Sequence, residues 1–322
     1  MSSPLARRAP LASLLALLML ASVSTSASAQ LGRIADRLKK GPNVSSLLEG
    51  EPPISTSLEH ATYGVDSLDR LDPPDSVFVP MSSLERTPTG GFTLGEGYYE
   101  MHTQSYCLKA GTHGPGGGDG YLYAAPQGSA EGAVVAILRN SVAHPDIPQR
   151  DIQVLLWAII ARAKFEDLEA RHKATALKLL THQELAMLNR NALDLMPGPV
   201  LDRALNSVPA PIRTVLEAEA KMRQMLTTPG TSFDEMERVA VLAGMAPLGE
   251  GSRAVPSGRW SLHPDGYYVR YIPQGYSYTV TQIWVPQGSP AVGKEYDPAT
   301  HIAVPGNTAR QRLIQSGRER KS

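Results

Sequence analysis

Cys107 is the only cysteine of the 322 residues, and its chemistry is the first that needs an explanation. A single cysteine excludes an intramolecular disulfide and a metal site built from several thiolates. The residue ends an aromatic strand pattern and precedes a glycine-rich loop over 114–120. Three roles are open to it: a small buried hydrophobe, a partner in an intermolecular disulfide, or a reactive thiol.

A glutamine in the first long helical pattern offers a partner for a reactive Cys107. Residues 152–157 read Ile-Gln-Val-Leu-Leu-Trp, so Gln153 and Trp157 are four positions apart. Tyr106-Cys107 and this run together resemble the bacterial thioester domains of surface adhesins, in which a cysteine after an aromatic residue is joined to a glutamine. The resemblance implies a Cys107–Gln153 thioester, which would give covalent adhesion without a cofactor.

The resemblance is confined to these two short segments. Ile152 and Leu155 stand where the family motif has threonine and alanine. Gln282, two residues before Trp284, is a second candidate partner for the cysteine. Beyond these segments, the chain as a whole resembles exported bacterial proteins.

An alternative hypothesis makes Cys107 the nucleophile of an exported cysteine hydrolase. Such an enzyme needs a histidine that lowers the pKa of the thiol and a carboxylate or amide that orients the histidine. Three histidines lie near it in sequence, His102, His113 and His144, and we assign the role to His144. No pair of them has the i, i+4 spacing of a helical zinc site, so we predict no metal and no cofactor.

Ten of the twelve tyrosines lie in two strand-like regions, one on each side of the helical part of the chain. If both regions share a sheet, an exposed row that includes Tyr98, Tyr121 and Tyr268 would bind an envelope glycan or a protein, because tyrosine offers rigid contact area with a polar tip. The other interpretation is that these rings alternate into the core of the sheet.

The pattern of the chain predicts strands over 91–138, helices over 148–246 and strands over 258–286. We assign the apolar run Ala133–Leu138 to a strand. Capping boxes at Thr181 and Ser232, and first-turn prolines at Pro199 and Pro211, mark the starts of helices.

The order of these regions predicts an α+β fold over 91–286, in which a mixed β-sheet forms from the N- and C-terminal strand regions and a central helical bundle is inserted between them. Residues 30–90, with repeated prolines, are expected to be a loosely structured N-terminal segment. Residues 287–322 are expected to form a flexible basic tail because of their turn residues and terminal arginines.

Residues 1–29 have the organisation of a secretory signal peptide. Arg7 and Arg8 precede the apolar stretch Leu11–Val23, and Ala27-Ser28-Ala29 is a typical cleavage site. Because no later apolar stretch is long enough to span a membrane, we expect an exported protein, periplasmic or extracellular, without a membrane span in its mature form.

The charge balance limits the partners. The chain has 31 basic and 31 acidic residues, and removal of Arg7 and Arg8 with the signal peptide leaves a net charge of −2. A nucleic-acid binder needs a basic face, so this class is excluded. The sequence therefore predicts a role in recognition, adhesion or structure at the envelope or outside the cell, rather than in turnover.

Overall fold

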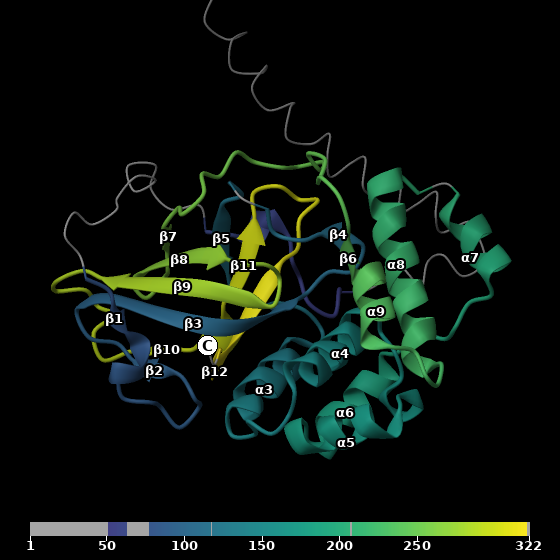
Figure 1. The fold of residues 1–322 in the computed structure, drawn as a ribbon, viewed down its shortest axis with the longest axis horizontal. Helices are drawn as coiled ribbons and strands as arrows, with labels where there is room; N and C mark the ends of the chain where they lie inside the picture. The colour runs from purple at the N-terminus through teal and green to yellow at the C-terminus, as the bar shows by residue number, and fades with distance from the viewer. Residues whose placement is uncertain (1–50, 63–76, 117, 207, 321–322) are drawn as a thin grey trace, which may run out of the picture.

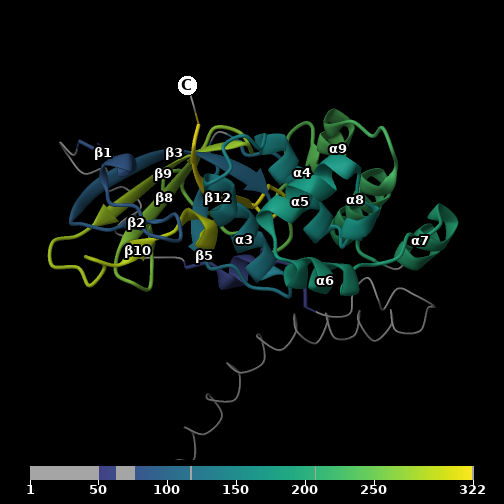
Figure 2. The ribbon, with the colours of Figure 1, turned by 90° about the horizontal axis from the view of Figure 1, so that it is seen from below.

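The computed structural model describes residues 51–62, 77–116, 118–206 and 208–320. The predicted signal peptide, over 1–29, lies outside the described residues. Strands gather on one side of the molecule and helices on the other (Figure 1), and the helices cover one end of the sheet when the molecule is turned (Figure 2). The predicted α+β class is confirmed.

One largely antiparallel sheet contains strands from both strand regions. Its central strand, β3, lies between β12 and β9, and only the short β1 pairs with β3 in parallel. The sheet follows the order β5 (Tyr121–Ala124), β11 (Ile302–Pro305), β12 (Leu313–Glu319), β3 (Gly97–Cys107), β9 (Tyr278–Val285), β8 (Tyr268–Pro273) and β7 (Ser261–Leu262), with β1 (Val79–Pro80) beside β3. The expectation that the two regions build one sheet is therefore confirmed.

The sheet is so strongly curled that its two ends approach each other. In Figure 1, β3, β9 and β8 run side by side, while β11 and β12 cross them steeply. The backbone N–H of Tyr123 in β5 donates to Ser261 Oγ in β7 at 3.0 Å, although these strands stand at opposite ends of the order. The concave face consequently encloses its own core, which includes Met101, Tyr271 and Leu313.

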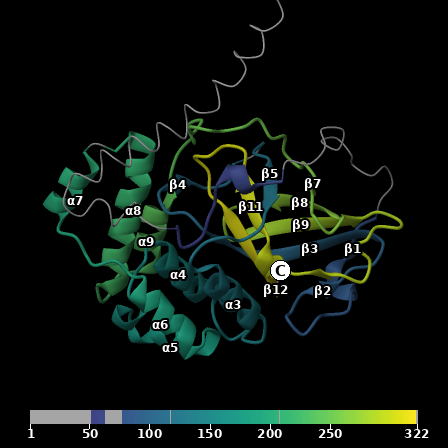
Figure 3. The same ribbon diagram turned by 180° about the vertical axis from the view of Figure 1, so that it is seen from behind.

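In the described part of the chain, seven α-helices make the second layer, and their core includes the convex side of β3 and β12 through Tyr106 and Ile314. The capping boxes at Thr181 and Ser232 are both present. Figure 3 shows α7 and α8 at the end of the molecule away from β1. The helices are α3 (Glu131–Val142), α4 (Gln149–Ile160), α5 (Ala170–Leu179), α6 (His182–Arg190), α7 (Gly198–Leu205), α8 (Ala210–Thr227) and α9 (Phe233–Ala240).

Four short strands form two further pairs outside the main sheet. They are β2 (Phe92–Thr93) with β10 (Glu295–Tyr296), and β4 (Thr112–His113) with β6 (Val241–Leu242). Among the described residues, no helix is long and apolar enough to cross a membrane.

The prediction of a strand over Ala133–Leu138 is wrong, because these residues belong to α3. A continuous apolar run fits a buried strand and a buried helix equally well. The residues beyond the run decide the matter, because Ser141 continues the helical spacing of the buried side chains Val134, Ile137 and Leu138.

The prediction of a flexible tail over 287–322 is also wrong for the described residues up to Arg320. β12 lies between β11 and β3, and residues 313–317 are buried. The arginines that suggested solvent exposure are bound within the fold: Arg310 pairs with Asp119 at 2.9 Å, and Arg318 donates to the carbonyl oxygen of Ile147 at 2.8 Å.

The segment 30–90 is packed where the structure describes it. Ile54 and Leu58 are buried in the core of the helical layer, and Met81 is buried in the core of the concave face. β1 adds a parallel strand beside the start of β3. The expectation of a loose segment is therefore wrong for 51–62 and 77–90, and its remaining residues lie outside the described parts.

Ile314→Ala tests the structural role of the C-terminal region. Loss of this fully buried side chain should lower the free energy of unfolding by about 2–5 kcal/mol. Glu319→Ala, at the exposed end of the same strand, is the control and should change it by less than about 0.5 kcal/mol. Urea denaturation measures both variants, and equal stabilities would show that β12 contributes nothing.

Candidate functional site

The structure brings Cys107 and Gln153 together. The backbone N–H of Cys107 donates to Gln153 Oε1 at 2.8 Å, and its carbonyl oxygen accepts from Gln153 Nε2 at 3.1 Å. Cys107 is fully buried at the end of β3, and Gln153 is buried in α4, 46 residues later. The contact is made by the backbone of the cysteine, and both amide atoms of the glutamine take part in it.

The glutamine contacts the backbone of Cys107 at a place where β3 has no strand partner on the β9 side. The two strands pair as far as Gln104, opposite Tyr278, and α4 lies along the edge of β3 beyond that point. Gln149, one turn before Gln153, donates Nε2 to the carbonyl oxygens of Ser105, at 3.0 Å, and Ser277, at 2.7 Å. The two amides thus supply hydrogen bonds that a neighbouring strand would otherwise make.

The geometry does not support the hydrolase hypothesis. Burial, with a smaller contribution from Glu237, raises the pKa of the Cys107 thiol well above its usual value, whereas a nucleophilic cysteine needs a lowered pKa and access to substrate. His144 is partly exposed, and its charged neighbour is Asp146, at 3.9 Å. His102 lies on the exposed face of the sheet and bonds Glu100.

The second candidate glutamine, Gln282, lies away from Cys107. Gln282 is bonded to Glu100 at 2.6 Å and to Arg270 at 2.6 Å, on the outer face of the sheet, away from the thiol. Within the described ranges, no three His, Cys, Asp or Glu side chains are grouped so that they could hold a metal ion.

The predicted tyrosine row exists in part. Tyr98, Trp284 and Tyr268 stand directly opposite one another in β3, β9 and β8, and all three are half-buried. Their rings stack at centroid distances of 5.6 and 4.8 Å, so Trp284 has a tyrosine on each face. Tyr121 is 1% exposed in the core of the concave face, so its assignment to the exposed row is wrong.

The tyrosines cover both faces of Trp284, and Phe78 packs edge-on against Tyr98 at a centroid distance of 5.9 Å. Recognition of a glycan by an aromatic side chain uses an open ring face, whereas cross-strand aromatic pairs stabilise a sheet. The next row is equally engaged, since Gln282 bonds Glu100 and Arg270. We therefore assign this row to the stability of the sheet.

A cleft of about 620 Å³ lies beside the end of β3. Lys109, two residues after Cys107 in the chain, is one of its lining residues. The walls of the cleft come from the end of β3, the residues that follow α4, one face of α8, and the segment Pro52–Glu59. The apolar part of the lining includes Ile54, Leu58, Leu108, Ile160, Leu193 and Leu216. The charged part consists of Lys109, Arg162, Arg223 and Arg312 with Glu59, Glu219 and Glu250. This size and mixed lining are typical of a site for a small molecule.

Two arginines of this cleft are almost completely buried. Arg223 is 3% exposed and donates Nε to the carbonyl oxygen of Ala161 at 2.6 Å. Arg312 is 2% exposed and donates to the carbonyl oxygens of Thr56, Thr308 and Arg310. Among the described residues, neither has a carboxylate within 4.0 Å, although buried charges are normally paired. Burial lowers the pKa of both, that of Arg312 to about 10.

Lys109 and Glu219 face the same space and are half-buried. Burial, assisted by Arg312, lowers the pKa of Lys109 to about 8. Burial raises the pKa of Glu219 to about 7, against the opposing effect of Lys109, Arg223 and Arg162. Two groups that titrate near neutrality within one cleft are a frequent sign of a functional site.

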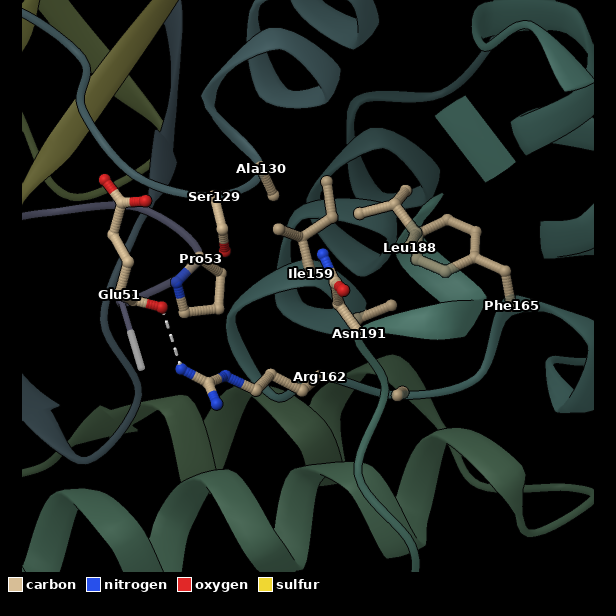
Figure 4. A pocket seen from close by; sticks show the side chains of 11 residues that line it. Glu51, Pro53, Ser129, Ala130, Ile159, Arg162, Phe165, Leu188 and Asn191 are labelled. Atoms are coloured by element: carbon tan, nitrogen blue, oxygen red, sulfur yellow. Dashed lines mark hydrogen bonds between the residues drawn. The ribbon is translucent and has the colours of Figure 1, made fainter. Parts of the chain in front are cut away.

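Arg162 has an unusual backbone conformation at the end of α4. Its φ is +51°, the one positive value among the described residues other than glycine. The N–H groups of Ala163 and Arg162 donate to the carbonyl oxygens of Ala158 and Ile159, a helix end at which glycine usually takes this position. The guanidinium donates to the carbonyl oxygen of Glu51 at 3.1 Å (Figure 4). A side chain retained at such a cost points to a use for it.

Comparison with known proteins finds no match to the chain among protein-family models, curated proteins or solved structures.

Sequence reasoning missed all the charged residues of the cleft, although one signal was present. Glu219 and Arg223 are one turn apart in α8, on the side of the helix that also carries the apolar residues Leu216, Met222 and Leu226. Charges on such an apolar side of a helix indicate a polar pocket at the helix contact. For Arg162 and Arg312 we find no comparable signal, because their burial depends on segments distant in sequence.

Arg162→Gly tests whether the arginine is retained for its side chain. Glycine adopts this conformation freely, so the free energy of unfolding should stay the same or rise by about 1 kcal/mol, despite the lost hydrogen bond to Glu51. Arg162→Ala, which keeps the strain and removes the guanidinium, should be the less stable of the two. Urea denaturation measures the free energy of unfolding of both variants. A glycine variant less stable than the alanine variant would show that the backbone of Arg162 is not strained.

Proposed function

We propose that this is an exported recognition protein that binds a small anionic ligand in the cleft beside the end of β3. The observation that carries the proposal is the pair of buried guanidinium groups, Arg223 and Arg312, which have only backbone carbonyl partners among the described residues. Lys109 and Arg162 add positive charge to the same cleft. An anion would add direct countercharge to that of Glu219, at a site where burial strengthens the interaction.

Binding rather than turnover fits the groups that are present. The cleft contains arginines that are held by backbone carbonyls, and the one thiol of the chain is buried away from it in the end of β3. Export follows from the predicted signal peptide, so the ligand would be met in the periplasm or outside the cell. The acidic groups of envelope molecules are anions that would be available there.

Two substitutions of opposite sign test this function. Lys109→Gln removes a positive charge and should weaken the binding of citrate by about tenfold, whereas Glu219→Gln removes a negative charge and should strengthen it by a similar factor. Isothermal titration calorimetry measures both, with circular dichroism to verify folding. If wild type binds neither citrate nor inorganic phosphate, or if the two variants shift the affinity in the same direction, the proposal fails.

The pH dependence has a defined direction. Protonation of Glu219, whose pKa is about 7, removes a negative charge from the cleft, and loss of the proton of Lys109, whose pKa is about 8, removes a positive one. As the pH rises from 6 to 9, Glu219 loses its proton and becomes negative, and Lys109 loses its positive charge, so the affinity for an anion should fall. The Glu219→Gln variant should lose the part of this dependence that lies near pH 7. Glu59 and Glu250 at the cleft and the three arginines complete the set of charges that face these groups.

A Cys107–Gln153 thioester is a second candidate, and the proximity of the two residues favours it. Its formation would join Sγ to Cδ, release Nε2 with the thiol proton as ammonia, and break the hydrogen bond from Nε2 to the Cys107 carbonyl oxygen. The intact mass of the mature protein decides the question. Loss of one ammonia per chain supports the thioester, whereas an unmodified mass, with a thiol that titrates after denaturation, overturns it and leaves the glutamine its structural role.

A further inference from the structure

A second, smaller pocket of about 250 Å³ adjoins the cleft. Pro53 and Arg162 line both spaces. Figure 4 shows Ile159, Leu188 and Phe165 on one side of the pocket and Glu51 and Pro53 on the other. Ala130, Ala158 and Ala163 add further apolar lining.

Arg162 stands where the two spaces meet. Its guanidinium is held by the carbonyl oxygen of Glu51 at 3.1 Å, and the strained φ of +51° sets the direction in which its side chain leaves α4. On the side of the cleft, the positive groups Lys109, Arg223 and Arg312 lie among the carboxylates that also line it, Glu59, Glu219 and Glu250. On the side of the small pocket, most of the lining residues are apolar, and the exceptions are Glu51, Ser129, Asn191 and Arg162 itself.

The geometry points to an amphipathic anion as the ligand, with its oxyanion head group in the charged cleft and a straight alkyl tail in the small pocket. This inference rests on the proposed function, because it takes the cleft as the anion site and adds the nature of the remainder of the ligand. A tail beside the head group would bury apolar surface of the pocket, and each methylene moved out of water stabilises the complex. Arg162, which lines both spaces, would contact the head group where the tail begins.

A series of straight-chain carboxylates, from acetate to decanoate and below their micelle concentrations, tests the inference. Each added methylene should increase the affinity about fourfold until the small pocket is filled, and further methylenes should add little. Alkyl phosphates of the same lengths distinguish a phosphate head group from a carboxylate. Titration calorimetry of the full mature chain gives the affinities. If the affinity does not change with the length of the alkyl chain, the inference is overturned.

Two plug variants locate the tail. Ser129 and Asn191 line the small pocket and have exposed side chains, so Ser129→Phe and Asn191→Phe should fill its mouth without disturbing the core. Each should reduce the affinity for decanoate to that for a short homologue and leave citrate binding unchanged. Gln127→Phe is the matched control, because Gln127 is an exposed residue of the same loop that does not line the pocket.

The outcomes separate the two proposals. If decanoate binds no better than acetate while citrate binding still depends on Lys109, the amphipathic ligand is wrong and the anion site stands. If no anion binds to wild type, the proposed function fails as well. If Gln127→Phe lowers decanoate affinity as much as Ser129→Phe does, the tail does not occupy the small pocket.

Discussion

The two hydrogen bonds between Gln153 and the backbone of Cys107 fix the relation between the sheet and the helices. β3 is the central strand, and its pairing with β9 ends just beyond Gln104, with a last hydrogen bond from the N–H of Ser105 to the carbonyl oxygen of Ser277. Without the amides of Gln149 and Gln153, polar backbone groups at the end of β3 would be buried without partners, which costs about 1–3 kcal/mol for each group. Because the two amides bond these backbone groups, they hold α4 in one position along β3.

The cleft is a consequence of this contact between α4 and β3. Lys109 comes two residues after Cys107, and Arg162 comes two residues after the last residue of α4, so pinning the strand to the helix brings both side chains to one space. α8 closes the space with Glu219 and Arg223, and the chain just before β12 contributes Arg312. Four segments that are far apart in sequence thus meet at one end of the sheet, which explains why a local motif could not reveal the site.

Sequence reasoning succeeded where one local pattern has one structural meaning. Capping boxes at Thr181 and Ser232 start α6 and α9, and the two tyrosine-rich regions share the sheet. It failed where one pattern has two meanings. The apolar run Ala133–Leu138 has no period of its own, and the arginines near the C-terminus resemble those of a solvated tail although Arg310 pairs with Asp119. The sequence predicted that Cys107 and Gln153 lie close together because a thioester would join them. In the structure they are close, and their contacts are hydrogen bonds to the backbone of Cys107.

Glu219 shows how a cleft that gathers positive side chains is compatible with folding. Lys109, Arg223 and Arg162 surround it, and its own charge moderates their mutual repulsion when no ligand is bound. Burial still penalises that charge, because the pKa of Glu219 is raised, and it penalises the charge of Lys109, because the pKa of Lys109 is lowered. Between pH 7 and 8 both groups are therefore ionised at a cost to the fold. In the proposed function, a bound anion would remove the penalty on Lys109 and increase the penalty on Glu219, so the carboxyl group would take up a proton as the ligand enters. The binding of an anion would then be linked to the uptake of a proton, through one glutamate that the apolar stripe of α8 carries into the cleft.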